Sequence, residues 1–353
     1  MRLKKFHDWP YRVKRLLAGV ILLLGAILSL SPSAFTRRET CSDKPVIAAP
    51  SAAQRGEEVI RFAVIGDFGQ AGSNEAAVAS LVKSWQPDFI ITTGDNNYPN
   101  GEATTIDANI GQYFSDYIFP YHGSYSPGTD ANRFFPTLGN HDWESGTVQP
   151  YLDYFPIDES EVNPNSSGNE RYYDFVQGPV HFFALDSDAK EPDGTTSTSR
   201  QARWLQAQLA ASTTPWQVVY FHHSPYSSSK HGSLERMQWP FAQWGVDIIL
   251  SGHDHTYERL HIDDIFYFVN GLGGRSIYTF YTPVAGSQVR YNENYGAMLV
   301  AASEANLDVE FHSITCGGEL IDTYTIEADR EADGMITVSP PLETQPHGGN
   351  TDD

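Results

Sequence analysis

Short apolar runs alternate with polar loops along the middle of the chain, and this pattern predicts its secondary structure. Residues 59–65 and 89–92 are apolar runs of β-type, whereas residues 74–85 carry alanine, valine and leucine at helical spacing. A strand, a helix and a second strand in this order predict a βαβ unit of an α/β sheet. Further strands are expected at 134–138, 171–176, 180–185, 216–221 and 246–250, and several more between 266 and 326.

Three segments of the middle region are less regular. Residues 199–209 place apolar side chains on one helical face, which predicts an amphipathic helix. Residues 237–244 show a similar helix-like face, whereas residues 101–135 have weak periodicity, which indicates a short helix with loops. The domain therefore combines helices and strands throughout its length.

The start of the chain has the composition of an export signal. Basic residues are concentrated in residues 1–15, and the uncharged apolar run 16–30 follows them. This order favours a cleaved secretory signal peptide, and the alternative is an uncleaved anchor that attaches the protein to a membrane through residues 16–35. Either reading places the rest of the protein outside the cytoplasm, periplasmic or secreted, because the basic flank stays inside. The expected segments are the signal or anchor at 1–35, a linker at 36–57, one folded domain at 58–327 and an acidic, disordered tail at 328–353.

Composition narrows the classes of function. The formal net charge is -21, which argues against nucleic acid as a partner because such binding needs a basic surface. Cys41 and Cys316 are the two cysteines of the sequence, so neither a disulfide scaffold nor a zinc-cysteine site is expected. Whether they pair with each other is left open by the sequence.

Five expected strands each end in a loop that carries a side chain able to bind a metal ion. Acid, amide and imidazole groups at the same end of successive strands converge on one edge of a sheet. Their joint occurrence predicts a metal site, although each loop alone would be read as a turn. The side chains are Asp67, Asp95, Asn140, His222 and the pair His253 and His255.

The same loops resemble the ordered blocks of the calcineurin-like metallophosphoesterases. The blocks are Gly66-Asp67-Phe68-Gly69, Gly94-Asp95-Asn96-Asn97-Tyr98, Gly139-Asn140-His141-Asp142, Val219-Tyr220-Phe221-His222 and Gly252-His253-Asp254-His255. Gly69 and Tyr98 narrow the resemblance to the purple acid phosphatases, in their small, single-domain form. The resemblance implies an α/β fold built as a four-layer α/β/β/α sandwich, with the metal site at the carboxyl ends of the strands.

The resemblance also implies two metal ions and their ligands. One carboxylate would bridge the ions, and a phenolate with two carboxylates would favour Fe(III) at site A. Site B, with one shared carboxylate and neutral ligands, suits divalent Zn, Mn or Fe. The implied ligands are Asp67, Asp95, Tyr98 and His255 at site A, and Asp95, Asn140, His222 and His253 at site B.

The implied reaction is hydrolysis of a small phosphorylated substrate, a phosphomonoester, by in-line attack of a metal-bound hydroxide. His141 and His231 are the candidates to protonate the leaving group. Of the adjacent pair His222 and His223, only His222 is expected to face the metals, because neighbours on a strand point to opposite sides. The alternatives are a phosphodiesterase or nucleotidase that uses the same binuclear site, and a secreted binding protein that keeps the sheet without catalysis.

Two further features are expected to be structural. Glu258 and Arg259 follow the last block and are predicted to form an ion pair with each other. The glycine cluster at residues 271–274 follows a strand without an obvious helix after it, so a dinucleotide-binding loop is not expected.

Overall fold

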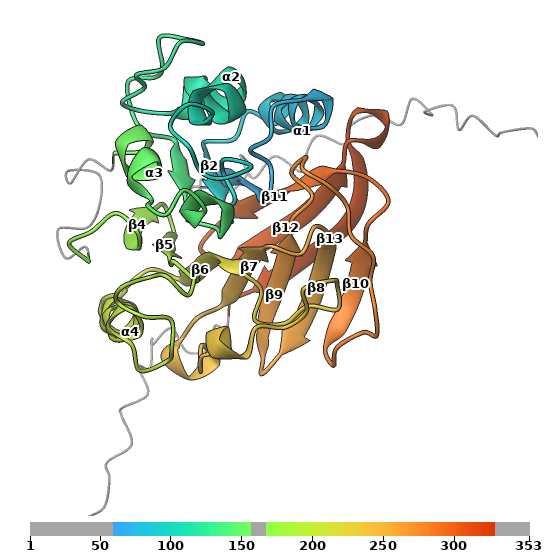
Figure 1. The fold of residues 1–353 in the computed structure, drawn as a ribbon. Helices are drawn as coiled ribbons and strands as arrows, with labels where there is room; N and C mark the ends of the chain where they lie inside the picture. Colours follow the sequence, from blue (N-terminus) through green and yellow to red (C-terminus); the bar gives the residue numbers. More distant parts are fainter. Residues whose placement is uncertain (1–58, 157–166, 329–353) are drawn as a thin grey trace, which may run out of the picture. The chain divides into compact units, whose positions relative to one another are not determined.

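Two β-sheets form the framework of the domain in the computed structural model, which describes residues 59–156 and 167–328 (Figure 1). These residues all belong to one compact unit of the chain. The six-stranded sheet has the order β13 (Glu319–Glu327), β12 (Asn306–Ser313), β11 (Gly296–Ala302), β1 (Ile60–Ile65), β2 (Phe89–Thr92) and β3 (Phe134–Pro136). The seven-stranded sheet has the order β10 (Ser287–Tyr291), β8 (Tyr257–Ile262), β9 (Ile265–Asn270), β7 (Ile248–Gly252), β6 (Trp216–His223), β5 (Val180–Ala184) and β4 (Tyr173–Gln177).

Alternation along β1 shows how the sheets are packed. Phe62 and Val64 point into the core shared by the two sheets, whereas Ala63 and Ile65 point into a second core beneath the helices. A strand that is buried on both faces is apolar at every position, which accounts for its continuous apolar run. The ring of Phe62 lies 5.0 Å from that of Phe182 in β5, edge to face, so the two sheets interlock.

Helices cover the outer face of each sheet. The helices α1 (Ser73–Ser84) and α2 (Gln112–Phe114) lie on the outer side of the six-stranded sheet, and α4 (Arg200–Ala211) lies on the outer side of the other (Figure 1). The layer order is therefore α/β/β/α, which confirms the predicted fold. Shorter segments complete the described helices: α3 (Gln149–Tyr154), the π-helix Asp107–Gly111, and the 3-10 turns Ser115–Tyr117, His141–Trp143, Glu235–Met237, Ala242–Trp244 and Thr315–Gly317.

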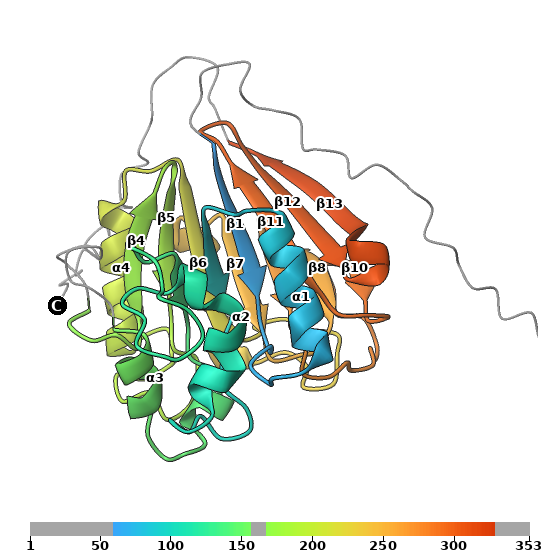
Figure 2. The same cartoon turned by 90° about the horizontal axis from the view of Figure 1, so that it is seen from above.

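The parallel strands bring their carboxyl ends together. In one sheet β1, β2 and β3 run parallel, and in the other β5, β6, β7 and β9 run parallel. Side chains of β1 and β7 belong to the one core between the two sheets, in the region where their labels lie in Figure 2. The loops after β1, β2, β3, β6 and β7 therefore emerge at one edge, as the sequence pattern predicts.

The structure differs from the sequence-based expectations in two elements. Residues 237–244 form no continuous helix but two 3-10 turns on either side of Pro240, which lacks the N–H that a helix needs at this point. The strand β8 was not predicted, because its sequence directly continues the last histidine block. Residues 1–58 and 329–353, with the expected signal or anchor, linker, Cys41 and tail, lie outside the described residues. Within the described ranges, no helix is long and apolar enough to span a membrane.

Candidate metal centre

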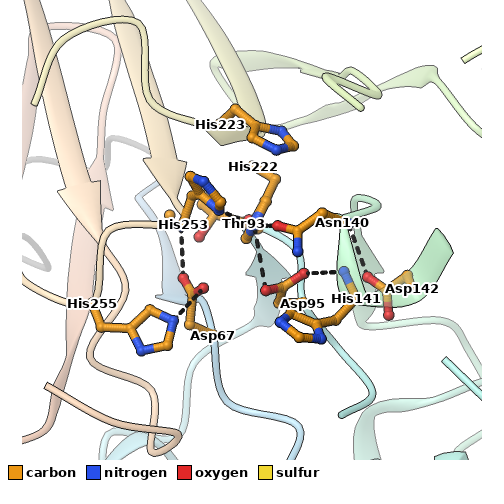
Figure 3. Close-up of polar contacts among 12 residues, drawn as sticks. Asp67, Thr93, Asp95, Asn140, His141, Asp142, His222, His223, His253 and His255 are labelled. Atoms are coloured by element: carbon orange, nitrogen blue, oxygen red, sulfur yellow. Dashed lines mark hydrogen bonds and ion pairs between the residues drawn. The ribbon is translucent and has the colours of Figure 1, made fainter. Parts of the chain in front are cut away.

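Both sheets contribute side chains to one buried cluster at the strand ends (Figure 3). Asp67, Asp95 and Asn140 follow β1, β2 and β3 of the six-stranded sheet. His222 lies near the end of strand β6, and His253 directly follows β7. Oxygen donors therefore come from one sheet and nitrogen donors from the other.

The backbone at three of these positions adopts a left-handed conformation. The φ angles are 54° at Asp67, 54° at Asp95 and 67° at His253. Such angles cost a non-glycine residue about 1–3 kcal/mol and persist only where the surroundings enforce them. At Gly139 a Cβ atom would lie 2.3 Å from the backbone nitrogen of Asp95, so the two loops can meet only with glycine there. The loops are thus held in a strained arrangement that points the side chains at one another.

The first set of donors, which we call group A, consists of Asp67, Asp95, Tyr98 and His255. The Tyr98 hydroxyl lies 2.9 Å from Asp95 Oδ2, 3.3 Å from Asp67 Oδ1 and 3.4 Å from His255 Nε2. His255 Nε2 lies 3.2 Å from Asp67 Oδ1. Four potential ligand atoms of group A therefore face one small volume.

The second set, group B, consists of Asp95, Asn140, His222 and His253. His222 Nε2 lies 3.1 Å from Asn140 Oδ1, 3.1 Å from His253 Nδ1 and 3.4 Å from Asp95 Oδ2. The same oxygen of Asp95 thus contacts Tyr98 in group A and His222 in group B. All seven residues predicted from the sequence as metal ligands lie in this one cluster.

The donor set fits metal ions, because buried carboxylate, phenol and imidazole groups gather around positions where a cation would offset their negative charge. Burial raises the pKa of Tyr98 well above its ordinary value, and the Asp95 and Asp67 carboxylates raise it further. Ionisation of this phenol therefore requires added positive charge. Burial opposes protonation of His222, but the nearby Asp95 and Asp67 carboxylates outweigh burial and raise the pKa of His222 to about 10. The negative surroundings of this imidazole therefore favour positive charge at this position.

Hydrogen bonds from surrounding groups orient the ligands. His222 Nδ1 donates to the Thr93 carbonyl at 2.8 Å, which leaves Nε2 free to bind a metal. His255 Nδ1 hydrogen-bonds Ser276 Oγ at 2.6 Å and is fixed in the same way. Such partners raise the basicity of imidazole ligands and hold their rings in place.

The two carboxylates are held by backbone amides. The His141 amide donates to Asp95 Oδ1 at 2.8 Å, and the His253 amide donates to Asp67 Oδ2 at 2.9 Å. One oxygen of each carboxylate is thereby fixed by its own protein partner. The other oxygen of each remains among the ligand atoms of groups A and B.

Both candidate proton donors lie at the cluster. The His141 ring lies 4.4 Å from that of Tyr98, and its Nδ1 donates to the Pro99 carbonyl at 2.6 Å. The His231 ring is exposed and stacks on His253 at 4.1 Å, and its backbone amide donates to Asp254 Oδ1 at 2.7 Å. The structure therefore brings together every site residue that the sequence predicted.

His222 contacts Asp95 and Asn140 as expected, but His223 also lies close to the cluster. The ring of His223 lies 4.4 Å from that of His253, and the nitrogens of His222, His223 and His253 fall within 4.8 Å of one another. The register of β6 against β7 shifts between Tyr220 and His223, so the regular alternation of a strand does not hold there. His223 Nδ1 hydrogen-bonds Ser187 Oγ at 2.9 Å, and it contacts neither Asp95 nor Asn140.

The predicted ion pair between Glu258 and Arg259 was also wrong. Adjacent residues of β8 point to opposite faces, so these two cannot meet. Arg259 pairs instead with Asp322 of β13, with 2.8 Å between Nε and Oδ2. Glu258 is fully buried and accepts a hydrogen bond from the Ser228 amide at 2.8 Å, which anchors the loop that carries His231.

The segment after β9 also borders the cluster, although it was not predicted from the sequence. Ser276 orients His255, the ring of Tyr278 stacks on His255 at 4.1 Å and 7°, and the guanidinium carbon of Arg275 lies 5.0 Å from the centre of the Tyr98 ring. The glycine cluster at residues 271–274 was the available signal, because glycines after a strand indicate close approach of backbones. No metal-binding residue type marked the segment itself.

Comparison with known proteins identifies the family. Residues 60–257 match the model of the calcineurin-like phosphoesterases. The chain is 24% identical over 291 residues to purple acid phosphatase 17 of Arabidopsis thaliana, a match that covers 75% of this chain and 83% of that protein.

Two solved structures share the fold. The purple acid phosphatase PPD1 from yellow lupin (Lupinus luteus) seeds aligns with a TM-score of 0.61 at 18% identity, covering 80% of this chain and 57% of that one. GAP50, the anchor in the inner membrane complex of Plasmodium, aligns with a TM-score of 0.60 at 18% identity, covering 78% and 90%. The family match spans more than half of the chain and contains all seven residues predicted as metal ligands. The chain belongs to the calcineurin-like phosphoesterase family, resembles its purple acid phosphatases, and is a hydrolase that acts on phosphoesters.

Proposed function

We propose that this protein is a binuclear, metal-dependent phosphomonoesterase of the acid phosphatase type. The observation that carries the proposal is the position of Asp95, whose Oδ2 lies 2.9 Å from Tyr98 Oη and 3.4 Å from His222 Nε2. One carboxylate oxygen between two sets of ligands is the arrangement that a bridged pair of metal ions needs.

Each group of ligands would hold one ion. Group A, with two carboxylates and a phenol, would favour Fe(III), and group B, with one shared carboxylate and neutral donors, would favour Zn, Mn or Fe in the divalent state. The ions would supply Lewis acidity toward the phosphoryl oxygens and a water molecule acidic enough to ionise near neutral pH. The residues of both groups would fix the ions and exclude competing ligands.

His141 and His231 are the two residues that would protonate the leaving group. His141 donates from Nδ1 to the Pro99 carbonyl, so its Nε2 is the nitrogen available to a substrate. His231 lies on the exposed side of His253, where an incoming ester would meet it. Either imidazolium could donate a proton to the departing alkoxide, whose high basicity makes unassisted departure slow.

Location outside the cytoplasm is part of the proposal. It rests on the basic residues of the segment 1–15 and on the uncharged apolar run 16–30 that follows them. A fusion of residues 1–60 to a periplasmic reporter would test it. Reporter activity is expected only with the apolar run intact.

The reaction is tested by comparing mono- and bis-p-nitrophenyl phosphate with the metal-loaded protein. Both esters release the same chromophore, so their rates report on the phosphate group alone. We expect the monoester to be turned over at least about tenfold faster than the diester. Faster turnover of the diester would favour the phosphodiesterase alternative, and turnover of neither ester would contradict the proposal.

A further inference from the structure

The segment after β9 is built against the metal centre. The Gly273 amide donates to the Gly66 carbonyl at 3.0 Å, and the Arg275 amide donates to the Asp67 carbonyl at 3.1 Å. At Gly271 a Cβ atom would lie 2.3 Å from the carbonyl oxygen of Asp254, so a larger residue would push the segment away. The glycine cluster therefore lets this backbone lie directly on the loop that carries Asp67.

Two cations reach the same side of the centre. The guanidinium carbon of Arg275 lies 5.0 Å from the centre of the Tyr98 ring, and Lys230 Nζ lies 4.2 Å from the centre of the Tyr278 ring. The rings are linked through His255, which stacks on Tyr278 at 4.1 Å and whose Nε2 lies 3.4 Å from the Tyr98 hydroxyl. Arg275 and Lys230 therefore flank the group A side of the centre.

Neither cation is neutralised by a carboxylate in the described part of the chain. Arg171, Arg259 and Lys83 each pair with an acidic side chain within 2.8 Å. Arg275 and Lys230 instead contact ring faces beside the cluster, so their positive charges are not offset there by an acidic side chain. A ring face leaves the N–H groups of a cation unpaired, so both side chains keep donors for an arriving anion.

We propose that Arg275 and Lys230 form an anion subsite at the edge of the metal centre, and that the preferred substrates carry a second anionic group beyond the phosphate that is hydrolysed. The second group is a carboxylate or another phosphate on the leaving side of the ester. Arg275 can bind it through two N–H groups in parallel, and Lys230 adds a mobile point charge. The inference rests on the proposed function and specifies the substrate class of the same site.

The negative charge of the rest of the protein adds to the argument. A surface with many carboxylates repels anionic substrates, so a local positive region is needed to hold one against the long-range field. An ester with one phosphate can be held by the metal ions alone. A substrate with a second anionic group gains from the subsite and would therefore be bound in preference.

The test measures binding of two phosphonates that cannot be hydrolysed. Propylphosphonate and 3-phosphonopropionate differ by one terminal carboxylate, and isothermal titration calorimetry with the metal-loaded protein gives both dissociation constants. We expect the carboxylate compound to bind about tenfold more tightly to the unmodified protein. We expect Arg275→Gln and Lys230→Gln each to reduce that preference about threefold, and the double variant to abolish it, because an exposed ion pair contributes a factor of this size. Arg290→Gln, which alters an exposed arginine that hydrogen-bonds Ser287, is the matched control and should keep the full preference.

Propylphosphonate also serves as the internal control for folding, since every correctly folded and metal-loaded variant should bind it equally. If the unmodified protein hydrolyses p-nitrophenyl phosphate but binds the two phosphonates equally, the subsite is refuted and the proposed function stands. The same conclusion follows if the double variant keeps the preference. If the protein neither hydrolyses the ester nor binds either phosphonate, the proposed function and the subsite both fail.

Discussion

Two buried acids eight residues apart in the chain are accommodated in opposite ways. Asp67 lies in the candidate metal centre, fully buried, with the His253 amide and the side chains of Tyr98 and His255 around its carboxylate. Glu75 lies in the first turn of α1 and is 1% exposed, and neither of its carboxyl oxygens has a hydrogen-bond partner among the described residues. Burial alone raises the pKa of Glu75 to about 10, so its carboxyl group is neutral. The carboxylate of Asp67, in contrast, is surrounded by groups that can support a charge.

The comparison shows that burial of an acid does not by itself mark a functional site. A carboxylate that is to hold metal ions must have oriented partners that support its charge, whereas a carboxyl group without partners remains protonated in the core. Asp95 behaves like Asp67 in having partners for its charge. His222 and His141 hold the pKa of Asp95 below its ordinary range despite its burial. Replacing a carboxyl group by an amide should therefore reduce activity strongly at the metal centre. The same replacement at Glu75 in α1 should leave activity unchanged.

The largest effect is expected for Asp95→Asn. The substitution keeps the shape but removes the charge that both metal positions share, so kcat/KM for p-nitrophenyl phosphate should fall at least about 1000-fold, equivalent to about 4 kcal/mol. Asp116→Asn, which alters an exposed carboxylate paired with Lys83, is the control and should retain full activity. Activity within tenfold of the unmodified protein would show that Asp95 does not bridge the ions.

A smaller effect on rate but a clear effect on colour is expected for Tyr98→Phe. The hydroxyl contacts both Asp67 and Asp95, and as a phenolate bound to Fe(III) it would give a broad visible absorption band. The band should disappear in the variant, while activity falls by about tenfold because the two carboxylates remain. A colourless, active unmodified protein that contains no iron would refute Fe(III) at site A and leave the binuclear proposal intact.

The smallest effect on activity is expected for Glu75→Gln, which should instead change stability. Unfolded Glu75 loses its proton near pH 4.5, whereas folded Glu75 keeps it to about pH 10, so between these values the folded state holds one proton more. This contribution to stability is complete below pH 4.5 and is lost as pH rises, by up to about 1.4 kcal/mol per pH unit.

The variant removes that dependence on pH. Urea unfolding should therefore show Glu75→Gln to be more stable than the unmodified protein by about 2 kcal/mol at pH 7, and by less at pH 5. kcat should be unchanged at both values. An equal or lower stability of the variant at pH 7 would show that Glu75 is charged in the folded protein.

The sequence could predict the ligands because each lies at the end of a strand, where the direction of the chain fixes the side of the sheet. It could not predict that His223 also reaches the cluster, since that depends on a local shift of register in β6. Nor could it predict Glu75 as a buried acid, because its helical position near Ser73 reads as an exposed first turn with a favourable negative charge. Contacts such as that of Arg275 with Tyr98 join segments far apart in the chain and carry no local signal.

The central claim, a pair of metal ions bridged by Asp95, is tested most directly by counting metal in the purified protein. Elemental analysis should find two ions per chain in the unmodified protein and one in Asn140→Ala, which alters group B alone. Asp95→Asn should hold fewer than one, because both groups lose their shared charge. Two ions per chain in Asp95→Asn, or a single ion in the unmodified protein saturated with metal, would contradict the account.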